Sequence, residues 1–482
     1  MNKIDECYKK KLYTEKMMQF GEGNFMRAFV DWIIDEMNKT DNFDGSVVVI
    51  QPRNSDRIKV LNEQNGLFTL YLNGIKNGEA ISEHSVINSI SRGINTYSDY
   101  DEFLKVAENP ELRFITSNTT EAGIVYEEKD RLEDRPQNSF PGKLTAFLYH
   151  RYQIFNGNLE RGFIFLPCEL IDKNGEKLKE IILKLAKLWN LEEGFIEWIN
   201  EANTFCNTLV DRIVPGYPKD KIEEITKELG YEDKLLVEGE QFHLWVIEGP
   251  QWVKEEFPAD KAGLNVLFVD DLTPYRTRKV RILNGAHTSM VPVSYLYGKD
   301  TVREAVEDTF LGKFIQDTIY DEIIPTLELS KKELQDFTKA VLDRFKNPFI
   351  KHYLMSISLN SISKFKTRVL PSILQYQKIN NRLPNRLVFS LAALIAFYRG
   401  EREGEGIDLK DDEYTLTLFQ NLWASYDKTR KSLERIVEEI LGYEKSWDMD
   451  LNKIDGLSQQ VTDYLEVILE KGMKEAVRIH VQ

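Results

Sequence analysis

Four basic residues stand within six positions, from Arg276 to Arg281, in a chain whose formal net charge is −15. Apolar residues alternate with them, so we expect part of this segment to be buried. Because burial lowers the pKa of a lysine, Lys279 is a candidate general acid or base near neutral pH. Asn284 and His287 follow three positions apart, so a helix would place them on one face. An amide and an imidazole there could polarise a carbonyl oxygen, and the segment therefore predicts proton transfer at a carbonyl or hydroxyl group.

No sequence pattern in this chain indicates another kind of catalytic centre. The remaining five histidines show no metal-ligand spacing, and the three cysteines form no CxxC pair. Neither a GxSxG elbow nor a phosphate-binding P-loop is present, so hydrolase and kinase chemistry have no support. The alternative interpretation of the basic segment is a structural one, a basic helix end with a satisfied buried histidine. We expect no metal site.

A glycine turn near the N-terminus is typical of a dinucleotide site. Gly21 and Gly23 lie between the apolar run Met17–Phe20 and a helical pattern over Phe25–Asn38. In a dinucleotide-binding fold the first glycine makes the tight turn, and the second lets the backbone approach a pyrophosphate at the helix N-terminus. The third glycine of the full fingerprint is replaced by Met26. An ordinary strand–helix turn is the alternative.

Two further strands are followed by polar loops that suit a nucleotide. The strand Val47–Ile50 leads into Gln51, which could hydrogen-bond a ribose hydroxyl. Arg53 suits a 2′-phosphate instead, so the spacing leaves NAD and NADP open. The strand Arg113–Ser117 leads into the small polar residues 118–123, at the strand end where open α/β sheets hold their ligands.

The two halves of the chain differ in pattern. Short apolar strands alternate with helices up to residue 272, which predicts a mostly parallel α/β domain over 1–272. Beyond that point the periodicity is almost entirely helical, and we expect a mostly α-helical domain over 273–482. A cleft between two such domains is a favoured ligand site.

Composition limits the partners and the setting. With 42% apolar residues the chain can bury a large core, and its negative charge opposes nucleic acid and anionic lipid. The longest apolar stretch, Leu387–Tyr398, is too short to span a bilayer. The few cysteines and the absence of an apolar leader favour a cytoplasmic protein. Oligomeric state is not predicted.

Long stretches of the chain resemble the long-chain, polyol-specific dehydrogenases, in order and over most of its length. The resemblance implies a zinc-free enzyme whose Rossmann-type domain binds NAD(H) and whose helical domain closes over a sugar. The matching segments are Gln19–Phe29, Arg113–Ile124, Ser139–Tyr152, Phe165–Gly175, Asn207–Gly216, Phe242–Pro250, Lys279–Gly298, Arg344–Pro371 and Ala392–Gly400.

The resemblance also implies residue roles. Lys279 is the expected general acid/base, while Asn284 and His287 hold the reacting oxygen and a neighbouring hydroxyl. Lys364 is expected to contact the substrate, and Asp211 to lie beside it as a polar neighbour. The expected cofactor contacts are Phe20, Gly21, Glu22, Gly23, Asn24, Phe25, Arg27, Gln51, Asn118, Thr119, Thr120 and Glu121.

Two departures from the family pattern fall on substrate contacts. Leu170 stands where the family has an oxyanion-site asparagine, for which Asn174 is a candidate replacement, and Ser356 stands where it has an arginine. Both changes favour a sugar acid over a plain polyol. The substrate we expect is D-tagaturonate, with fructuronate or a mannitol-type polyol as alternatives, and a non-catalytic nucleotide-binding protein as a different class. Cations that could hold the carboxylate are Lys364, Lys366, Arg368 and Arg281.

Overall fold

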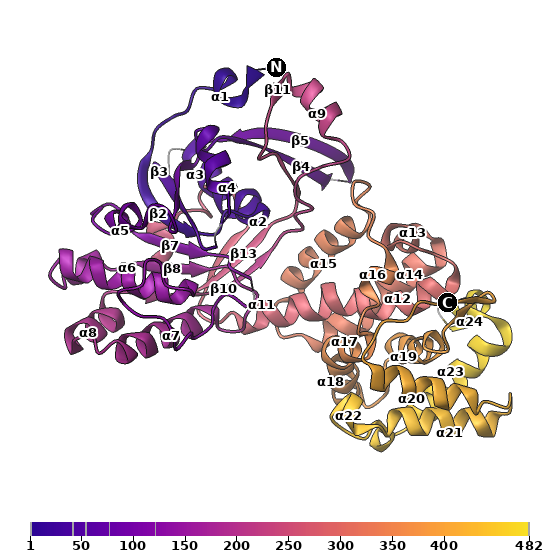
Figure 1. Cartoon of the computed structure of the whole chain (residues 1–482). Coiled ribbons are helices and arrows are strands. Elements are labelled where there is room, and N and C mark those ends of the chain that lie inside the picture. The colour runs from indigo at the N-terminus through magenta and orange to yellow at the C-terminus, as the bar shows by residue number, and fades with distance from the viewer. Residues whose placement is uncertain (1, 41–42, 54, 77, 121, 481–482) are drawn as a thin grey trace. The chain divides into compact units, whose positions relative to one another are not determined.

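The computed structural model of the chain divides into two compact units (Figure 1). Residues 2–40, 43–53, 55–76, 78–120 and 122–480 are described. The first unit comprises residues 1–74 and 81–272, and the second comprises residues 75–80 and 273–482.

A six-stranded, fully parallel sheet forms the centre of the first unit. Numbering its strands by sequence gives the spatial order 3-2-1-4-5-6, the doubly wound order whose reversal next to the first strand creates a ligand crevice. From edge to edge the strands are β6 (Ile90–Asn95), β3 (Gly45–Gln51), β2 (Thr14–Phe20), β7 (Phe114–Ser117), β8 (Ile164–Pro167) and β9 (Thr204–Phe205).

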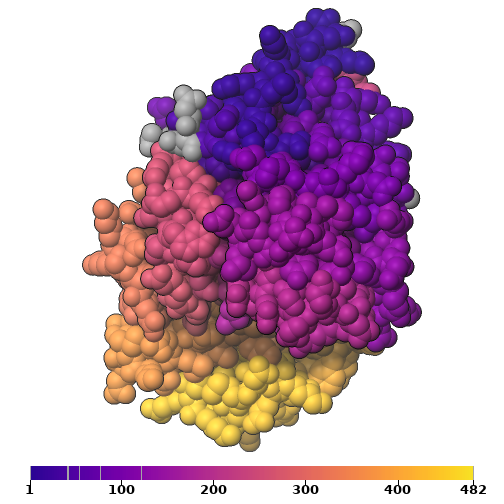
Figure 2. All heavy atoms as spheres, turned by 90° about the vertical axis from the view of Figure 1, so that its left-hand side faces the viewer, coloured from indigo at the N-terminus to yellow at the C-terminus, as the bar shows by residue number. Residues whose placement is uncertain are grey.

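Both faces of this sheet are covered, which explains why its strands are continuously apolar. Alternate residues of one strand enter different cores: Val47 and Val49 pack on one side, Val48 and Ile50 on the other. The helical path from Asn24 to Lys39 covers the first side. The second is covered by α5 (Tyr100–Val106), α6 (Phe140–Ile154), α7 (Asn174–Leu188) and α8 (Glu193–Glu201), part of the magenta surface in Figure 2.

Smaller sheets complete the first unit. Strand β10 (Asn207–Asp211) runs antiparallel to β13 (Leu244–Glu248), which pairs in parallel with β14 (Val266–Val269). A second three-stranded sheet contains β12 (Val237–Glu240), β4 (Phe68–Lys76) and β5 (Glu79–Ile87).

From residue 273 onward the second unit is helical apart from a short strand pair, β15 (Glu401–Arg402) with β16 (Glu405–Gly406), among the residues that the structure describes. Together with the parallel sheet, this confirms the expected fold class. Its central helix is α19 (Asn385–Phe397), whose residues from Leu387 onward are all buried and which packs on α12 (Gly285–Tyr297) and α23 (Leu457–Lys471). No helix in the described ranges is long and apolar enough to cross a membrane.

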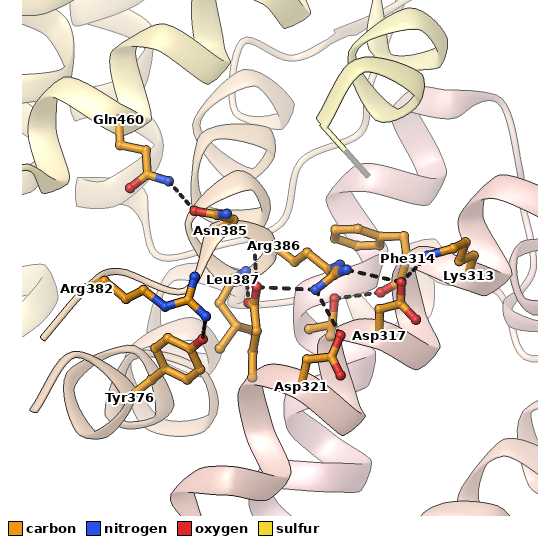
Figure 3. A network of polar contacts seen from close by, with 12 residues as sticks. Lys313, Phe314, Asp317, Asp321, Tyr376, Arg382, Asn385, Arg386, Leu387 and Gln460 are labelled. Atoms are coloured by element: carbon orange, nitrogen blue, oxygen red, sulfur yellow. Dashed lines mark hydrogen bonds and ion pairs between the residues drawn. The ribbon is translucent and has the colours of Figure 1, made fainter. Parts of the chain in front are cut away.

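A buried carboxylate fixes the start of α19. Glu322 accepts hydrogen bonds from the backbone N–H groups of Arg386 (2.9 Å) and Leu387 (2.8 Å), where the helix N-terminus favours negative charge. The Arg386 side chain reaches back to Asp317 (3.1 Å) and Asp321 (3.3 Å), as Figure 3 shows. This network holds the core helix that supports α12.

Candidate active site

The glycine turn follows β2 and needs glycine at its first position. Gly21 has φ +117°, and its N–H donates to the carbonyl of Ile50 (3.0 Å). A Cβ there would lie 3.1 Å from the carbonyl oxygen of Asn118, on the neighbouring strand's loop. Gly21 thus combines a left-handed conformation with a close backbone approach.

Gly23 has a different reason to be glycine. It caps the helical path that begins with α2 (Asn24–Met26) and continues through the π-helix η1 (Arg27–Asp31) and α3 (Trp32–Lys39). Among the described residues, no heavy atom lies within 4 Å of the position its Cβ would take. The start of the helical path therefore has open space where a Gly23 side chain would stand, and this would let a dinucleotide pyrophosphate approach the backbone.

The side chains around this turn serve the interior of the unit. Phe20 is fully buried and packs on Phe103 and Phe140. Arg27 is buried, donates to the Leu235 carbonyl (2.7 Å) and to Asn24 Oδ1 (2.6 Å), and burial lowers its pKa to about 10. Phe20 and Arg27 are predicted cofactor contacts. Because their side chains are engaged inside the unit, their backbone groups are the parts that could contact a cofactor.

Phe25 and Glu22 are partly buried beside the turn. Phe25 stacks on Phe29 with ring centroids 5.0 Å apart, and Glu22 Oε1 accepts from Ser55 Oγ (3.4 Å). Both keep part of their surface accessible, as a cofactor contact requires, and their roles stay predictions.

Gln51, the predicted ribose ligand, organises the loop after β3. Its amide donates to the carbonyls of Arg53 (2.6 Å) and Ser55 (2.7 Å), and its oxygen accepts from the Ile58 N–H (3.3 Å). The side chain is fully buried. The loop that Gln51 shapes, rather than the Gln51 side chain, would therefore contact a ribose at this point. Arg53, in the same loop, is exposed.

The loop after β7 is fixed by a residue that the sequence analysis did not single out. Glu169 is buried and accepts from the Thr119 N–H and Oγ1 (both 2.9 Å) and from Ser117 Oγ (3.0 Å). Asn118 donates to the Cys168 carbonyl (3.2 Å), and Thr120 has φ +74°. The predicted contact Glu121 lies outside the described residues.

In the sequence, the one signal for a role of Glu169 is its position in the chain. It stands beside Leu170, the position where the sequence departs from the family's oxyanion-site asparagine, and Leu170 is 62% exposed. Burial raises the pKa of Glu169, against the hydrogen bonds from Thr119 and Ser117 that stabilise its charged form.

Asn174 does not have the free donor expected of a replacement oxyanion residue. Its Nδ2 lies within 3.0–3.2 Å of three carbonyls, those of Pro167, Glu169 and Thr208, although an amide has only two hydrogens. Its Oδ1 accepts from the N–H groups of Gly175 (3.0 Å) and Thr208 (2.8 Å). In this structure the buried amide joins β8, α7 and β10, and its role toward the substrate stays a prediction. Asp211, at the end of β10, is also buried.

The basic segment of the second unit contains a π-helix, η3 (Lys279–Asn284), between α11 (Thr273–Arg278) and α12. The Gly285 N–H donates to the carbonyl of Val280, five residues earlier. An α-helix turns about 100° per residue, so residues five apart would point about 140° away from each other. The i→i+5 pattern of a π-helix brings such residues to one side, and it therefore places Lys279 and Asn284 on a shared face.

His287 lies one turn further on and is a neutral, buried imidazole. It is 9% exposed, and its Nε2 has no hydrogen-bond partner in the described part of the chain. Its ring stacks on Phe345 (4.3 Å) and meets His352 edge-on (5.0 Å). Burial lowers its pKa well below the ordinary value, and His352, Arg344 and Arg368 add to this effect. A neutral imidazole can donate or accept one hydrogen bond to a substrate oxygen.

The candidate substrate cations on helix α17 (Ser361–Arg368) differ in their contacts. Lys366 forms an ion pair with Asp448 (3.0 Å). Lys364 donates to the Ile357 carbonyl (2.8 Å), and burial and then Arg368 lower its pKa. Lys364 and Arg368 are four residues apart and share a face, whereas Lys366 is committed elsewhere. Arg281, on η3, donates to Ser372 Oγ (2.9 Å).

The sequence analysis did not assign roles to three residues beside His287, namely Arg344, Phe345 and His352. All three lie in the segment Arg344–Pro371 that carries the family resemblance. In the described ranges no group of three or more His, Cys, Asp or Glu residues could hold a metal ion.

Comparison with known proteins shows the family. The model of the mannitol dehydrogenase Rossmann domain matches residues 15–261, and that of the mannitol dehydrogenase C-terminal domain matches residues 271–469. An altronate oxidoreductase of Bacillus subtilis strain 168 is 56% identical over 465 residues, 96% of this chain and 95% of that protein. One of Escherichia coli O1:K1 is 50% identical over 467 residues, 97% of each.

Solved structures agree on the fold. A substrate-free D-sorbitol dehydrogenase has a TM-score of 0.80 at 23% identity, covering 99% of this chain and 96% of its own. The ternary complex of Pseudomonas fluorescens mannitol 2-dehydrogenase with NAD and D-mannitol has a TM-score of 0.64 at 23% identity, covering 97% and 94%. On the family models and the high identity of its relatives, the chain belongs to the mannitol dehydrogenase family and is a dehydrogenase.

Proposed function

We propose that this chain catalyses the NAD-dependent interconversion of D-tagaturonate and D-altronate, a step of hexuronate catabolism in the cytoplasm. The observation that carries the proposal is 50–56% identity, over nearly the whole of both chains, to altronate oxidoreductases. The residues expected to perform the chemistry, Lys279, Asn284 and His287, are all present.

The first unit suits the cofactor. The chemistry expected of NAD(H), when bound, is hydride transfer between C4 of its nicotinamide and the ketone carbon of the substrate. Gly23 and the helix that follows it would hold the pyrophosphate through backbone N–H groups. The loop Asn118–Thr120, held by Glu169, would border the same crevice at the ends of the parallel strands.

The second unit suits the proton transfer. In reduction, the ammonium group of Lys279 gives a proton to the oxygen that gains negative charge, and becomes a neutral amine. The Asn284 amide and the neutral His287 ring hold that oxygen or the neighbouring hydroxyl. In oxidation, neutral Lys279 takes the hydroxyl proton, so turnover of the alcohol is expected to rise with pH.

The test is a substrate panel followed by NADH absorbance. We expect tagaturonate to give the highest kcat/KM, with fructuronate and the uncharged ketose fructose behind it, and NADH to be preferred over NADPH. Preference for fructuronate would contradict the substrate assignment. Preference for NADPH would point to the exposed Arg53 as a 2′-phosphate ligand. Tight NADH binding without turnover of any compound would favour a non-catalytic role.

A further inference from the structure

Two partly buried arginines of the second unit, Arg281 and Arg368, form no ion pair with a carboxylate among the described residues. Within the part of that unit that the structure describes, no carboxylate lies within ion-pair distance of Arg281 or Arg368. Other arginines there behave differently: Arg386, Arg402 and Arg430 each form ion pairs with acidic side chains. Arg382 also forms no ion pair, but it is exposed and donates to Tyr376 Oη. Arg281 and Arg368 are partly buried, so water can replace a missing carboxylate less well there.

Both arginines lie at one junction, where η3 and α12 meet α17 and α18 (Leu370–Asn380). Arg281 Nη1 donates to Ser372 Oγ at 2.9 Å, which ties η3 to α18. A Cβ on Gly285 would lie 3.0 Å from the carbonyl oxygen of Arg368, so α12 and the end of α17 are in close contact. This junction therefore contains the residue after Asn284 and the residue two places after Lys279.

The junction also acts on the groups expected to bind the substrate oxygen. Arg368 disfavours the protonated form of His287 and lowers the pKa of Lys364. His287 Nε2 is buried and lacks a hydrogen-bond partner in the described residues. An unpartnered buried imidazole beside an unpaired guanidinium is costly in the free chain, and a polar, negatively charged ligand would offset that cost.

Guanidinium groups match one ligand chemistry especially well. Their planar N–H donors bind a carboxylate through two parallel hydrogen bonds, and such charge-assisted bonds are stronger than neutral ones. Desolvation lowers the pKa of both Arg281 and Arg368, but an arginine stays charged near neutral pH. The junction thus keeps two positive charges partly shielded from water.

We propose that Arg281 and Arg368 bind the carboxylate of the substrate and so select a sugar keto acid over a neutral ketose. This inference rests on the proposed function, which makes the substrate a hexuronate-derived keto acid. It assigns the carboxylate to the junction of η3 and α17, and it leaves Lys364 to a hydroxyl group and Lys366 to Asp448.

The experiment compares Arg281→Gln and Arg368→Gln with the matched control Lys366→Gln, which removes a charge from α17 at the Asp448 ion pair. Initial rates of tagaturonate and fructose reduction give kcat and KM, NADH fluorescence gives the Kd of the cofactor, and thermal unfolding checks the fold. We expect each arginine variant to raise the KM for tagaturonate roughly 10- to 100-fold, the scale of one lost hydrogen bond to a charged group. Fructose turnover and NADH affinity should stay within about twofold.

A second pair of variants protects the test against misfolding. Arg281→Lys and Arg368→Lys keep the charge, so they should recover part of the KM but lose the paired hydrogen bonds. Folded arginine variants with an unchanged KM for tagaturonate would overturn the inference alone, as would an equal loss of fructose turnover. Failure of the unmodified chain to reduce tagaturonate would overturn the proposed function and the inference with it.

Discussion

The two units treat their polar side chains in opposite ways. In the first, Gln51 and Asn174, two side chains predicted to touch ligands, have their hydrogen bonds satisfied within the unit. In the second, His287 Nε2 has no hydrogen-bond partner among the described residues. Arg281 and Arg368 form no ion pair with a carboxylate there, and Arg281 donates only to Ser372 Oγ. Under the proposed function, this contrast predicts that backbone groups recognise the dinucleotide and side chains recognise the sugar acid.

Physical chemistry explains the division. A pyrophosphate is large and doubly charged, and a row of backbone N–H groups can hold it provided that the loops are rigid. Side chains in the first unit are therefore used to fix loops, as Glu169 fixes Thr119. Sugar acids differ from one another by single hydroxyl and carboxyl groups, and rejecting the wrong one requires polar groups that only the right one satisfies.

The largest expected effect belongs to the second unit. Lys279→Ala removes the only group assigned to proton transfer, so kcat should fall by at least ~10², the usual scale of general acid–base catalysis. The Kd for NADH should not change, because the first unit would hold the cofactor. Stopped-flow or steady-state NADH absorbance measures the first quantity, and fluorescence titration the second.

Near-normal turnover of folded Lys279→Ala would assign the proton transfer to another group. Loss of NADH affinity in the same variant would break the comparison itself, since a side chain of the second unit would then contribute to cofactor binding.

The sequence was informative where one residue type has one physical use. The apolar strand Val47–Ile50 predicts a sheet covered on both faces, and Gly21 predicts a tight turn; the structure has both. It was less informative where a polar residue has several uses. An asparagine suits an oxyanion site or a strand–helix junction equally well, and only the positions of Pro167 and Thr208 show which applies to Asn174.

The π-helix illustrates a second limit. Asn284 and His287 have helical spacing, but Lys279 and Asn284 are five apart, which an α-helix would separate. Hydrophobic periodicity does not reveal a single widened turn, so a shared face for Lys279 and Asn284 can be inferred only from the π-helix of the structure. Family resemblance named these residues, and the backbone explains their spacing.

A smaller effect is expected from Gly23→Ala in the first unit. Its φ of −71° suits alanine and its Cβ would meet no atom of the described residues, so thermal stability should stay the same or rise slightly. The added methyl group would occupy space expected for the pyrophosphate, and the Kd for NADH should rise about tenfold or more.

Gly21→Ala is the matched control for this prediction. Its φ of +117° and the Asn118 carbonyl 3.1 Å away make alanine strained, so this variant should lose stability by roughly 1–2 kcal/mol as well as affinity. Unchanged NADH binding in Gly23→Ala would argue that side chains, not backbone, hold the dinucleotide.

The smallest effect on turnover is expected from Asp31→Asn, which tests the one carboxylate beneath the glycine turn that the first unit leaves incompletely satisfied. Asp31 is fully buried, its Oδ2 accepts from Gln19 Nε2 (3.3 Å), and its Oδ1 has no partner among the described residues.

Burial raises the pKa of Asp31 to about 7. Between about pH 4 and pH 7 the folded chain therefore keeps a proton that the unfolded chain has lost, and the free energy of unfolding falls as the pH rises, by roughly 2–4 kcal/mol over the window. Asparagine has no such titration, so thermal unfolding midpoints measured from pH 4.5 to pH 7.5 should depend less on pH in Asp31→Asn than in the unmodified chain. The same pH dependence in both would mean that Asp31 is already ionised at acid pH. The hydrogen bond from Gln19 and the charge of Arg27, which both favour the ionised form, would then outweigh the effect of burial, and the first unit would hold this carboxylate as a charged group.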